Sequence, residues 1–144
     1  HAVDTSADAL TIAQSNAERL GFGDRVQFYQ GRWFEPLDSV KGSIAGMISN
    51  PPYIPSQEVL NLQPEVTIHE PHLALDGGED GLACLQHLIQ VAPMYLKPSG
   101  LWMVEMMQGQ MDTIVMRLDH AGYTNIQRLR DLEGVDRFAM AVVP

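Results

Sequence analysis

The tetrapeptide Asn50-Pro51-Pro52-Tyr53 directly follows an apolar run, and its groups could together hold a planar NH2 group. Asn50 offers a side-chain carbonyl as a hydrogen-bond acceptor, and the two prolines offer main-chain carbonyls without N–H groups of their own. The Asn50 oxygen and the Pro51 carbonyl would accept the two hydrogens, while the Tyr53 ring would stack on the plane of the group. This arrangement predicts chemistry at the held nitrogen, because positioning alone can lower a barrier by several kcal/mol.

A strand must end just before this tetrapeptide if the tetrapeptide is to lie at the edge of a sheet. Residues 44–49 form a nearly continuous apolar run, which predicts a strand buried on both faces. Periodic apolar positions elsewhere predict three helices, the first of them capped by Thr5. We expect helices near residues 5–20, 82–92 and 111–121, and strands near residues 1–4, 26–30, 44–49, 101–106, 125–129 and 137–143.

The order of these elements predicts the fold class. Strands that alternate with helices predict an α/β fold with a mostly parallel sheet, and two final strands without a helix between them predict an antiparallel hairpin. Ligands of open parallel sheets bind outside the carboxyl ends of the strands. Asp4, Asn50 and Glu105 each fall at such an end. We therefore expect a binding site where these strand ends converge.

The composition excludes some classes of protein. The chain has 144 residues, of which 45% are hydrophobic and 19% are charged, and its net charge is −9. This size predicts a single globular domain over residues 1–144. An acidic chain is poorly suited to bind nucleic acid directly, because such binding depends on clustered Lys and Arg. No apolar run is long enough to span a membrane, and the single cysteine allows no internal disulfide, which fits a reducing cytoplasm.

Three potential zinc ligands, His69, His72 and Cys84, lie in one part of the sequence. A fourth ligand at a suitable spacing is missing, and Cys84 falls in an apolar helical stretch that is typical of a packed core. The sequence therefore predicts no metal site.

Five segments occur in an order that resembles a known family. They are "AVDTSADAL", "NPPYIP", "EPHLALDGGEDGL", "LKPSGLWMVEMMQGQ" and "DLEGVDRFAMA". Together they resemble the release-factor glutamine methyltransferases, the HemK/PrmC family. The pattern "NPPY" alone is shared with adenine-N6 DNA methyltransferases, whereas the block "EPHLALDGGEDGL" is the most specific element. The resemblance covers nearly the whole chain, which corresponds to the C-terminal part of the family's catalytic domain.

The resemblance implies a class I S-adenosylmethionine-dependent methyltransferase fold, which is Rossmann-like, with S-adenosyl-L-methionine as the cofactor. Asp4 matches the acidic residue that accepts the ribose hydroxyls, and Trp33 matches a residue beside the adenine. Asn50 matches a position close to the methionine end of the cofactor. The family usually has an acidic residue where Arg32 stands, and a guanidinium cannot accept the hydrogens of the adenine amino group.

The resemblance also implies that Asn50, Pro51, Pro52 and Tyr53 bind the substrate amide and are the catalytic residues; we call residues 50–53 the amide clamp. Glu70 matches a loop that packs beside this clamp, so we expect Glu70 to organise the site and bind substrate. The family typically has Glu-Ile-Gly where this chain has Glu105-Met106-Met107, and the lost glycine predicts a different turn. We therefore assign Glu105 no role.

Two parts of the family's proteins have no counterpart in this sequence: an N-terminal helical domain that helps to recognise the release factor, and the first strand with its glycine-rich loop. The first strand lies centrally in the expected sheet, so its loss would remove the middle ladder and expose strand edges. We therefore expect an incomplete catalytic domain that binds S-adenosylmethionine weakly or not at all and is inactive as an isolated chain.

The predicted reaction is methyl transfer to the side-chain amide nitrogen of glutamine in the Gly-Gly-Gln motif of a peptide chain release factor, in the cytoplasm. Three alternatives remain open: a glutamine methyltransferase of a ribosomal protein, a nucleic-acid adenine-N6 methyltransferase, and an inactive fragment that acts only as an interaction module. The net charge and the "EPHLAL" block disfavour the adenine enzyme. The oligomeric state does not follow from the sequence.

Overall fold

The computed structural model describes residues 1–61 and 71–144 of the chain. The chain forms two compact units, His1–Lys41 and Gly42–Pro144, and each is described by itself. Among the described helices, none is both long enough and apolar enough to cross a bilayer.

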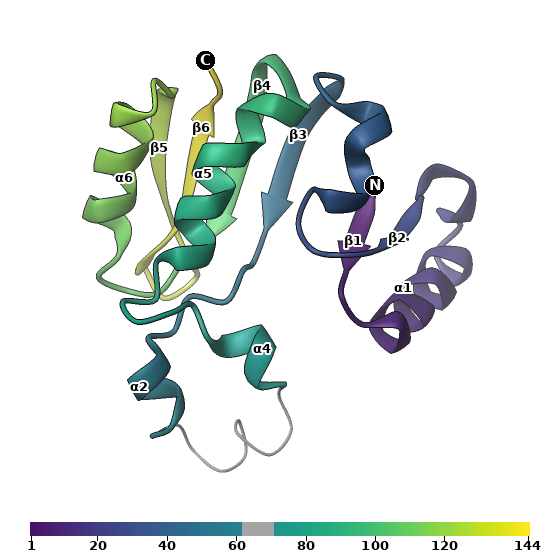
Figure 1. Cartoon of the computed structure of the whole chain (residues 1–144), viewed down its shortest axis with the longest axis horizontal. Coiled ribbons are helices and arrows are strands. Elements are labelled where there is room, and N and C mark those ends of the chain that lie inside the picture. The colour runs from purple at the N-terminus through teal and green to yellow at the C-terminus, as the bar shows by residue number, and fades with distance from the viewer. Residues whose placement is uncertain (62–70) are drawn as a thin grey trace. The chain divides into compact units, whose positions relative to one another are not determined.

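The first unit is a pair of short parallel strands joined by a helix (Figure 1). Asp4 lies opposite Gln30, so both residues stand at the carboxyl ends of their strands. The elements are β1 (Ala2–Asp4), α1 (Ala7–Arg19), a 3-10 turn (Gly23–Arg25), β2 (Phe28–Gln30) and a second 3-10 segment (Glu35–Val40).

Ser6 caps α1, and the prediction that Thr5 does so is wrong. Ser6 has an extended backbone with φ of −88° and ψ of 117°, and its hydroxyl accepts the Ala9 N–H at 3.2 Å. The Asp4 carboxylate in turn accepts the Ser6 N–H at 2.8 Å. Because Asp4 fixes the backbone at Ser6, the helix begins one residue later than a Thr5 cap would allow.

The second unit is built on a four-stranded mixed sheet with the order β3-β4-β6-β5 (Figure 1). β3 runs parallel to β4, and β6 pairs antiparallel with both β4 and β5. The pairing of β5 with β6 confirms the predicted C-terminal hairpin. The strands are β3 (Ile44–Ser49), β4 (Leu96–Glu105), β5 (Thr124–Arg130) and β6 (Asp136–Val142).

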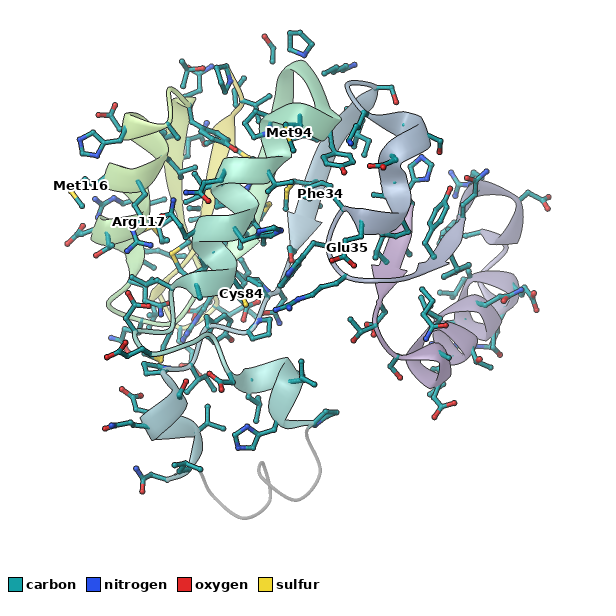
Figure 2. The ribbon with its side chains drawn as sticks, in the orientation of Figure 1. Phe34, Glu35, Cys84, Met94, Met116 and Arg117 are labelled. Atoms are coloured by element: carbon teal, nitrogen blue, oxygen red, sulfur yellow. The ribbon has the colours of Figure 1, made fainter. Side chains whose placement is uncertain are left out.

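Two helices, α5 (Ala83–Tyr95) and α6 (Met111–His120), lie side by side over this sheet (Figure 1). Arg117 of α6 donates a hydrogen bond to the Gln86 side chain of α5 at 2.9 Å, which ties the two helices together (Figure 2). Among the described residues between β3 and α5 are two short helices, α2 (Ser56–Val59) and α4 (His72–Leu75).

The hydrophobic core of the second unit lies between these two helices and the sheet. Trp102 of β4 is fully buried. Its ring packs edge-on against the Tyr123 ring, with 6.0 Å between the ring centroids. The Tyr123 hydroxyl donates to the Ile89 carbonyl at 2.8 Å, and burial raises its pKa far above the usual value. Cys84 is 8% exposed, which confirms its predicted core position (Figure 2). Other core residues are Leu85, Leu88, Val104, Ile114 and Leu118.

The prediction that β3 is buried on both faces is wrong. Ile48, near the end of this strand, is 80% exposed. β3 is the last strand of its sheet, and within the described ranges only β4 pairs with it. A short apolar run has the same periodicity in a central strand and in an edge strand, so the sequence pattern could not distinguish the two.

Candidate functional site

The amide clamp begins where β3 ends. Ser49 pairs with Val104 in the parallel register, so the next residues, Asn50 and Glu105, stand together at the carboxyl ends of β3 and β4. Asn50 is exposed, and no described residue hydrogen-bonds its side chain. Pro51 is buried, and none of the described groups donates to its carbonyl. Neither acceptor of the predicted clamp is therefore bonded to a described group.

Tyr53 is held at both ends. Its hydroxyl donates to the Glu105 carboxylate at 2.9 Å, and its main-chain carbonyl accepts a hydrogen bond from the Gln110 side chain at 2.9 Å. Burial, together with the hydrogen bond to Glu105 and its negative charge, raises the pKa of the Tyr53 hydroxyl above its ordinary value, although Arg137 opposes this. The hydroxyl therefore stays protonated at physiological pH, and Tyr53 is restrained at its hydroxyl and at its main-chain carbonyl.

The residues after Tyr53 are fixed against the loop that precedes α5. Ile54 donates its N–H to the Leu75 carbonyl at 3.1 Å, and its own carbonyl accepts the Gly77 N–H at 2.8 Å. The Ser56 N–H donates to the Gly78 carbonyl at 2.9 Å. These main-chain bonds align the two segments as a short parallel pair, which positions the C-terminal side of the clamp.

Glycines allow this close approach. Gly81 has φ of +72°, and a Cβ at this position would collide with the Tyr53 carbonyl oxygen and lie 2.8 Å from Gln110 Nε2. A Cβ at Gly77 would lie 2.7 Å from Tyr53 Cα. Both distances are shorter than van der Waals contact, so a side chain at either position would push the loop away from the clamp.

Asp76 stabilises the same loop. One oxygen of its carboxylate accepts both the Ser56 hydroxyl at 2.7 Å and the Gly78 N–H at 2.9 Å. These two hydrogen bonds, that from Ser56 first, lower the pKa of Asp76 below its ordinary value of 3.8. Because hydrogen bonds to the ionised form favour it, the ionised carboxylate is the form that supports the loop.

We expect Asp76→Asn to change how the free energy of unfolding of the full-length protein depends on pH in the acid range, because the variant lacks the Asp76 charge. A carboxylate whose pKa is lowered by folding stabilises the protein above its unfolded pKa, and this stability is lost as the pH falls through the lower folded pKa. The asparagine keeps the acceptor oxygen but cannot titrate. Chemical denaturation should therefore show that the wild type is more stable than Asp76→Asn at neutral pH, and that this advantage shrinks below pH 3.8. A stability difference that does not vary with pH would contradict this account.

Sequence reasoning missed Gln110 and the loop glycines as parts of the site. Gln110 is only 7% exposed and lies at the N-cap of α6, between the β4 strand end and the helix. A glutamine just before a periodic apolar helix is an ordinary polar residue by pattern alone. The sequence feature that could have predicted this loop is the group of glycines in residues 77–81, because such groups indicate turns that need a left-handed backbone.

Asp4 ends β1 in the first unit, and its orientation is set by its neighbours. Its Oδ1 accepts the Ser6 N–H at 2.8 Å, and its main-chain carbonyl accepts the Gly31 N–H at 3.0 Å. Asp4 is exposed, and its second carboxylate oxygen bonds to none of the residues that the structure describes. An oriented carboxylate with a free oxygen at a strand end is suited to accept hydroxyl donors.

Trp33 lies in a turn after β2, with a left-handed φ of 53° and a half-buried side chain. The Arg32 guanidinium carbon is 5.9 Å from the centre of the Trp33 ring. The Glu35 carboxylate accepts the Arg32 N–H at 3.2 Å, while the Glu35 N–H donates to the Arg32 carbonyl at 3.0 Å. The turn therefore carries an acidic side chain three residues after Arg32 (Figure 2).

The predicted site residues divide between the two units. The structure brings the clamp together with Glu105 and Gln110 in the second unit, whereas Asp4 and Trp33 belong to the first. Glu70, predicted to organise the site, lies outside the described residues, as does His69. In the ranges 1–61 and 71–144, no three His, Cys, Asp or Glu side chains are grouped as a metal site would require.

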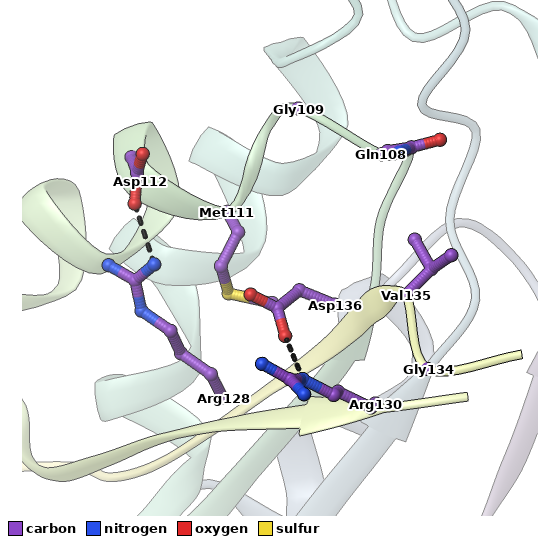
Figure 3. A pocket seen from close by; sticks show the side chains of 9 residues that line it. All are labelled: Gln108, Gly109, Met111, Asp112, Arg128, Arg130, Gly134, Val135 and Asp136. Atoms are coloured by element: carbon purple, nitrogen blue, oxygen red, sulfur yellow. Dashed lines mark hydrogen bonds and ion pairs between the residues drawn. The ribbon is translucent and has the colours of Figure 1, made fainter. Parts of the chain in front are cut away.

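A cavity of about 430 Å³ lies between the start of α6 and the β5–β6 hairpin (Figure 3). Two ion pairs border it: Arg128 to Asp112 at 2.6 Å, and Arg130 to Asp136 at 3.2 Å. Each arginine is thus already matched by a carboxylate, and solvent-exposed pairs of this kind add little stability. The other lining residues are Gln108, Gly109, Met111, Gly134 and Val135.

Comparison with known sequences relates the chain to methyltransferases. A family model described as "RMKL-like, methyltransferase domain" matches residues 1–60. A release factor glutamine methyltransferase from Synechocystis is 54% identical over 142 residues, which are 98% of this chain and 48% of that protein. One from Thermosynechococcus vestitus is 46% identical over 145 residues, which are 100% of this chain and 50% of that protein. The chain spans about half the length of these relatives, and the predicted resemblance is confirmed.

Two solved structures share the fold. Precorrin 8W decarboxylase from Methanobacterium thermoautotrophicum has a TM-score of 0.57 at 17% identity, over 99% of this chain and 67% of that one. The E. cuniculi Mtq2–Trm112 complex, described as responsible for methylation of the eRF1 translation termination factor, has a TM-score of 0.55 at 14% identity, over 97% of this chain and 80% of that one. With the methyltransferase-domain match, these likenesses confirm the class I methyltransferase fold.

Proposed function

We propose that this chain supplies the amide-binding part of a release factor glutamine methyltransferase. The reaction would transfer a methyl group from S-adenosyl-L-methionine to the side-chain amide nitrogen of glutamine in the Gly-Gly-Gln motif of a peptide chain release factor. The observation that carries this proposal is the exposed Asn50 side chain, which bonds to no described residue, three positions before a Tyr53 whose hydroxyl is held by Glu105. The 54% identity to a release factor glutamine methyltransferase supports the choice of substrate.

The clamp addresses the main chemical difficulty of this reaction. The lone pair of an amide nitrogen is delocalised into its carbonyl, so the nitrogen is a weak nucleophile. If Asn50 Oδ1 and the Pro51 carbonyl accept both amide hydrogens, they favour a pyramidal nitrogen whose lone pair points along one direction. The Tyr53 ring, fixed by Glu105, would stack on the amide and prevent it from rotating. This is catalysis by position and by preorganised dipoles.

When bound, S-adenosyl-L-methionine supplies a methyl group on a positively charged sulfur. By their chemistry alone, the Asp4 carboxylate would accept the ribose hydroxyls, the Trp33 ring would lie against the adenine, and Asn50 would contact the methionine end. The glutamine nitrogen would form the new N–C bond with this methyl group, and the electrons of the broken S–C bond would stay with sulfur. The methylated nitrogen then loses one proton to water.

The substrate would be a folded protein that presents its glutamine on a loop. A protein substrate fits the exposed position of Asn50, which a loop can reach without entering a deep pocket. Release factors act on ribosomes, so we propose that the reaction takes place in the cytoplasm. Glu70 keeps its proposed role beside the clamp, on the basis of its sequence position alone.

Mass spectrometry can test this function directly. The full-length protein that contains this chain is incubated with S-adenosyl-L-methionine in separate reactions with a bacterial release factor, with ribosomal proteins and with DNA. Tryptic peptides and released nucleosides are then analysed. We expect a mass gain of one CH2 on the glutamine of the Gly-Gly-Gln peptide, and none on a release factor in which this glutamine is replaced by glutamate. A gain on a ribosomal protein or on DNA adenine instead would identify an alternative substrate, and no gain on any of them would support a binding module.

A further inference from the structure

Gln110 makes more contacts with the clamp region than its position at a helix start requires. Its Nε2 donates to the Tyr53 carbonyl at 2.9 Å and to the Gly81 carbonyl at 3.3 Å, and its Oε1 accepts the Met107 N–H at 3.0 Å. Its main-chain carbonyl also begins the helix by accepting the Ile114 N–H. One buried side chain therefore joins the clamp, the glycine loop and the turn after β4.

These three partners require a carboxamide of this length. The group offers two N–H donors and one carbonyl acceptor in a single plane, and all three are used here. Methionine has a similar shape but would leave two carbonyls and one N–H buried without partners. Glutamate would keep the acceptor, but it would place a negative charge against two carbonyl oxygens. Asparagine is one methylene shorter, so it could not reach all three partners.

The hydrogen bond from Gln110 to the Tyr53 carbonyl restrains the orientation of the peptide segment that carries the Asn50 side chain. The Tyr53 hydroxyl is fixed by Glu105, and its carbonyl is fixed by Gln110, so both ends of the residue are restrained. Pro51 and Pro52 separate Tyr53 from Asn50, and their rings restrict the φ angles between the two. A shift at the Tyr53 carbonyl would therefore be passed along a stiff segment to the Asn50 side chain.

We propose that Gln110 is a positioning residue for methyl transfer: it sets the orientation of the Tyr53 peptide and thereby the geometry with which the clamp holds the substrate amide. This inference rests on the proposed function. In this proposal Gln110 acts through the Tyr53 peptide. Its loss is expected to impair the chemical step more than the binding of either substrate, because misplacement of a reacting group by about 1 Å can cost roughly 100-fold in rate.

The kinetic test compares Gln110→Met with Gln90→Met in the full-length protein. Gln90 is an exposed residue of α5, so the same change there tests for general effects of the substitution. We expect Gln110→Met to lower kcat about 10- to 100-fold and to change the KM for the release factor and for S-adenosylmethionine less than threefold. Gln90→Met should match the wild type. A kcat of Gln110→Met within twofold of the wild type would overturn the proposal.

A structural measurement keeps the inference separate from the identity of the substrate. Hydrogen–deuterium exchange should show faster exchange at residues 54–56 and 77–83 in Gln110→Met, because bonds between these segments depend on the Gln110 bridge. Gln90→Met should leave these segments unchanged. Unchanged exchange in Gln110→Met would overturn the positioning role even if the wild type proved to methylate another substrate or none.

A second variant covers the case in which Gln110→Met does not fold. Gln110→Asn keeps the amide and loses one methylene, so it should fold more readily. We expect it to lower kcat less than Gln110→Met would, and to speed exchange in the same two segments. A Gln110→Asn variant with a lowered melting temperature but an unchanged kcat would show that the residue supports only stability, and this would overturn the proposal.

Discussion

We expect that replacing Asn50 with alanine in the full-length protein lowers the rate of glutamine methylation about 10²- to 10³-fold at saturating substrate concentrations. The loss of one preorganised polar group has an effect of this size in other active sites. The physical reason is that one hydrogen of the substrate amide loses its acceptor, so the nitrogen is less pyramidal and less well directed. The fold should not change, because Asn50 is exposed and bonds to no described residue. Single-turnover kinetics with a labelled methyl donor would measure the chemical step.

Asn16→Ala is a matched control for this variant. Asn16 is an exposed asparagine of α1 whose side chain accepts a surface hydrogen bond from Arg19 at 3.1 Å. The Asn16→Ala variant should methylate at the wild-type rate, and its melting temperature should be close to that of the wild type. If Asn50→Ala turned over as fast as Asn16→Ala, the clamp would be assigned to the wrong residues.

The second large effect is expected from Gly81→Ala. Its Cβ would collide with the Tyr53 carbonyl oxygen and crowd Gln110 Nε2, so the loop must move away from the clamp. The left-handed φ of +72° adds backbone strain of about 1–3 kcal/mol for a residue with a side chain. We expect a lower melting temperature and a loss of methylation of at least tenfold, as the Tyr53 carbonyl is displaced.

Gly21→Ala separates these two causes. Gly21 has a similar φ of +75°, and a Cβ there would meet no atom within 4 Å. The Gly21→Ala variant should therefore have the same backbone strain as Gly81→Ala and a lowered melting temperature, but it should keep full methylation activity. Equal loss of activity in both glycine variants would show that strain, and not the collision with the clamp, accounts for the effect.

The parts of the fold that depend on local sequence were predictable. The periodic residues Leu85, Ile89 and Ala92 predicted α5, because a helix repeats its buried face every three to four residues. The C-terminal hairpin followed from two strands without a helix between them. The placement of Asn50 at a strand end also followed from the sequence, since an apolar run stops at that residue.

The features that depend on tertiary neighbours were not predictable in this way. Ser6 replaced Thr5 as the helix cap because the Asp4 carboxylate holds the Ser6 N–H, and either residue type makes a good cap. The exposure of Ile48 depends on whether another element covers its face of the sheet, and an apolar run does not show this. The role of Gln110 depends on three partners from distant segments, and spacing along the chain contains no trace of such contacts.

The residue that follows Asn50 protects it chemically. An exposed asparagine usually ages by deamidation, in which the backbone nitrogen of the next residue attacks the side-chain amide to form a succinimide ring. Here the next residue is Pro51, whose nitrogen carries no hydrogen and cannot act in this way. The asparagine of the proposed clamp can thus remain open to solvent without deamidating by this route.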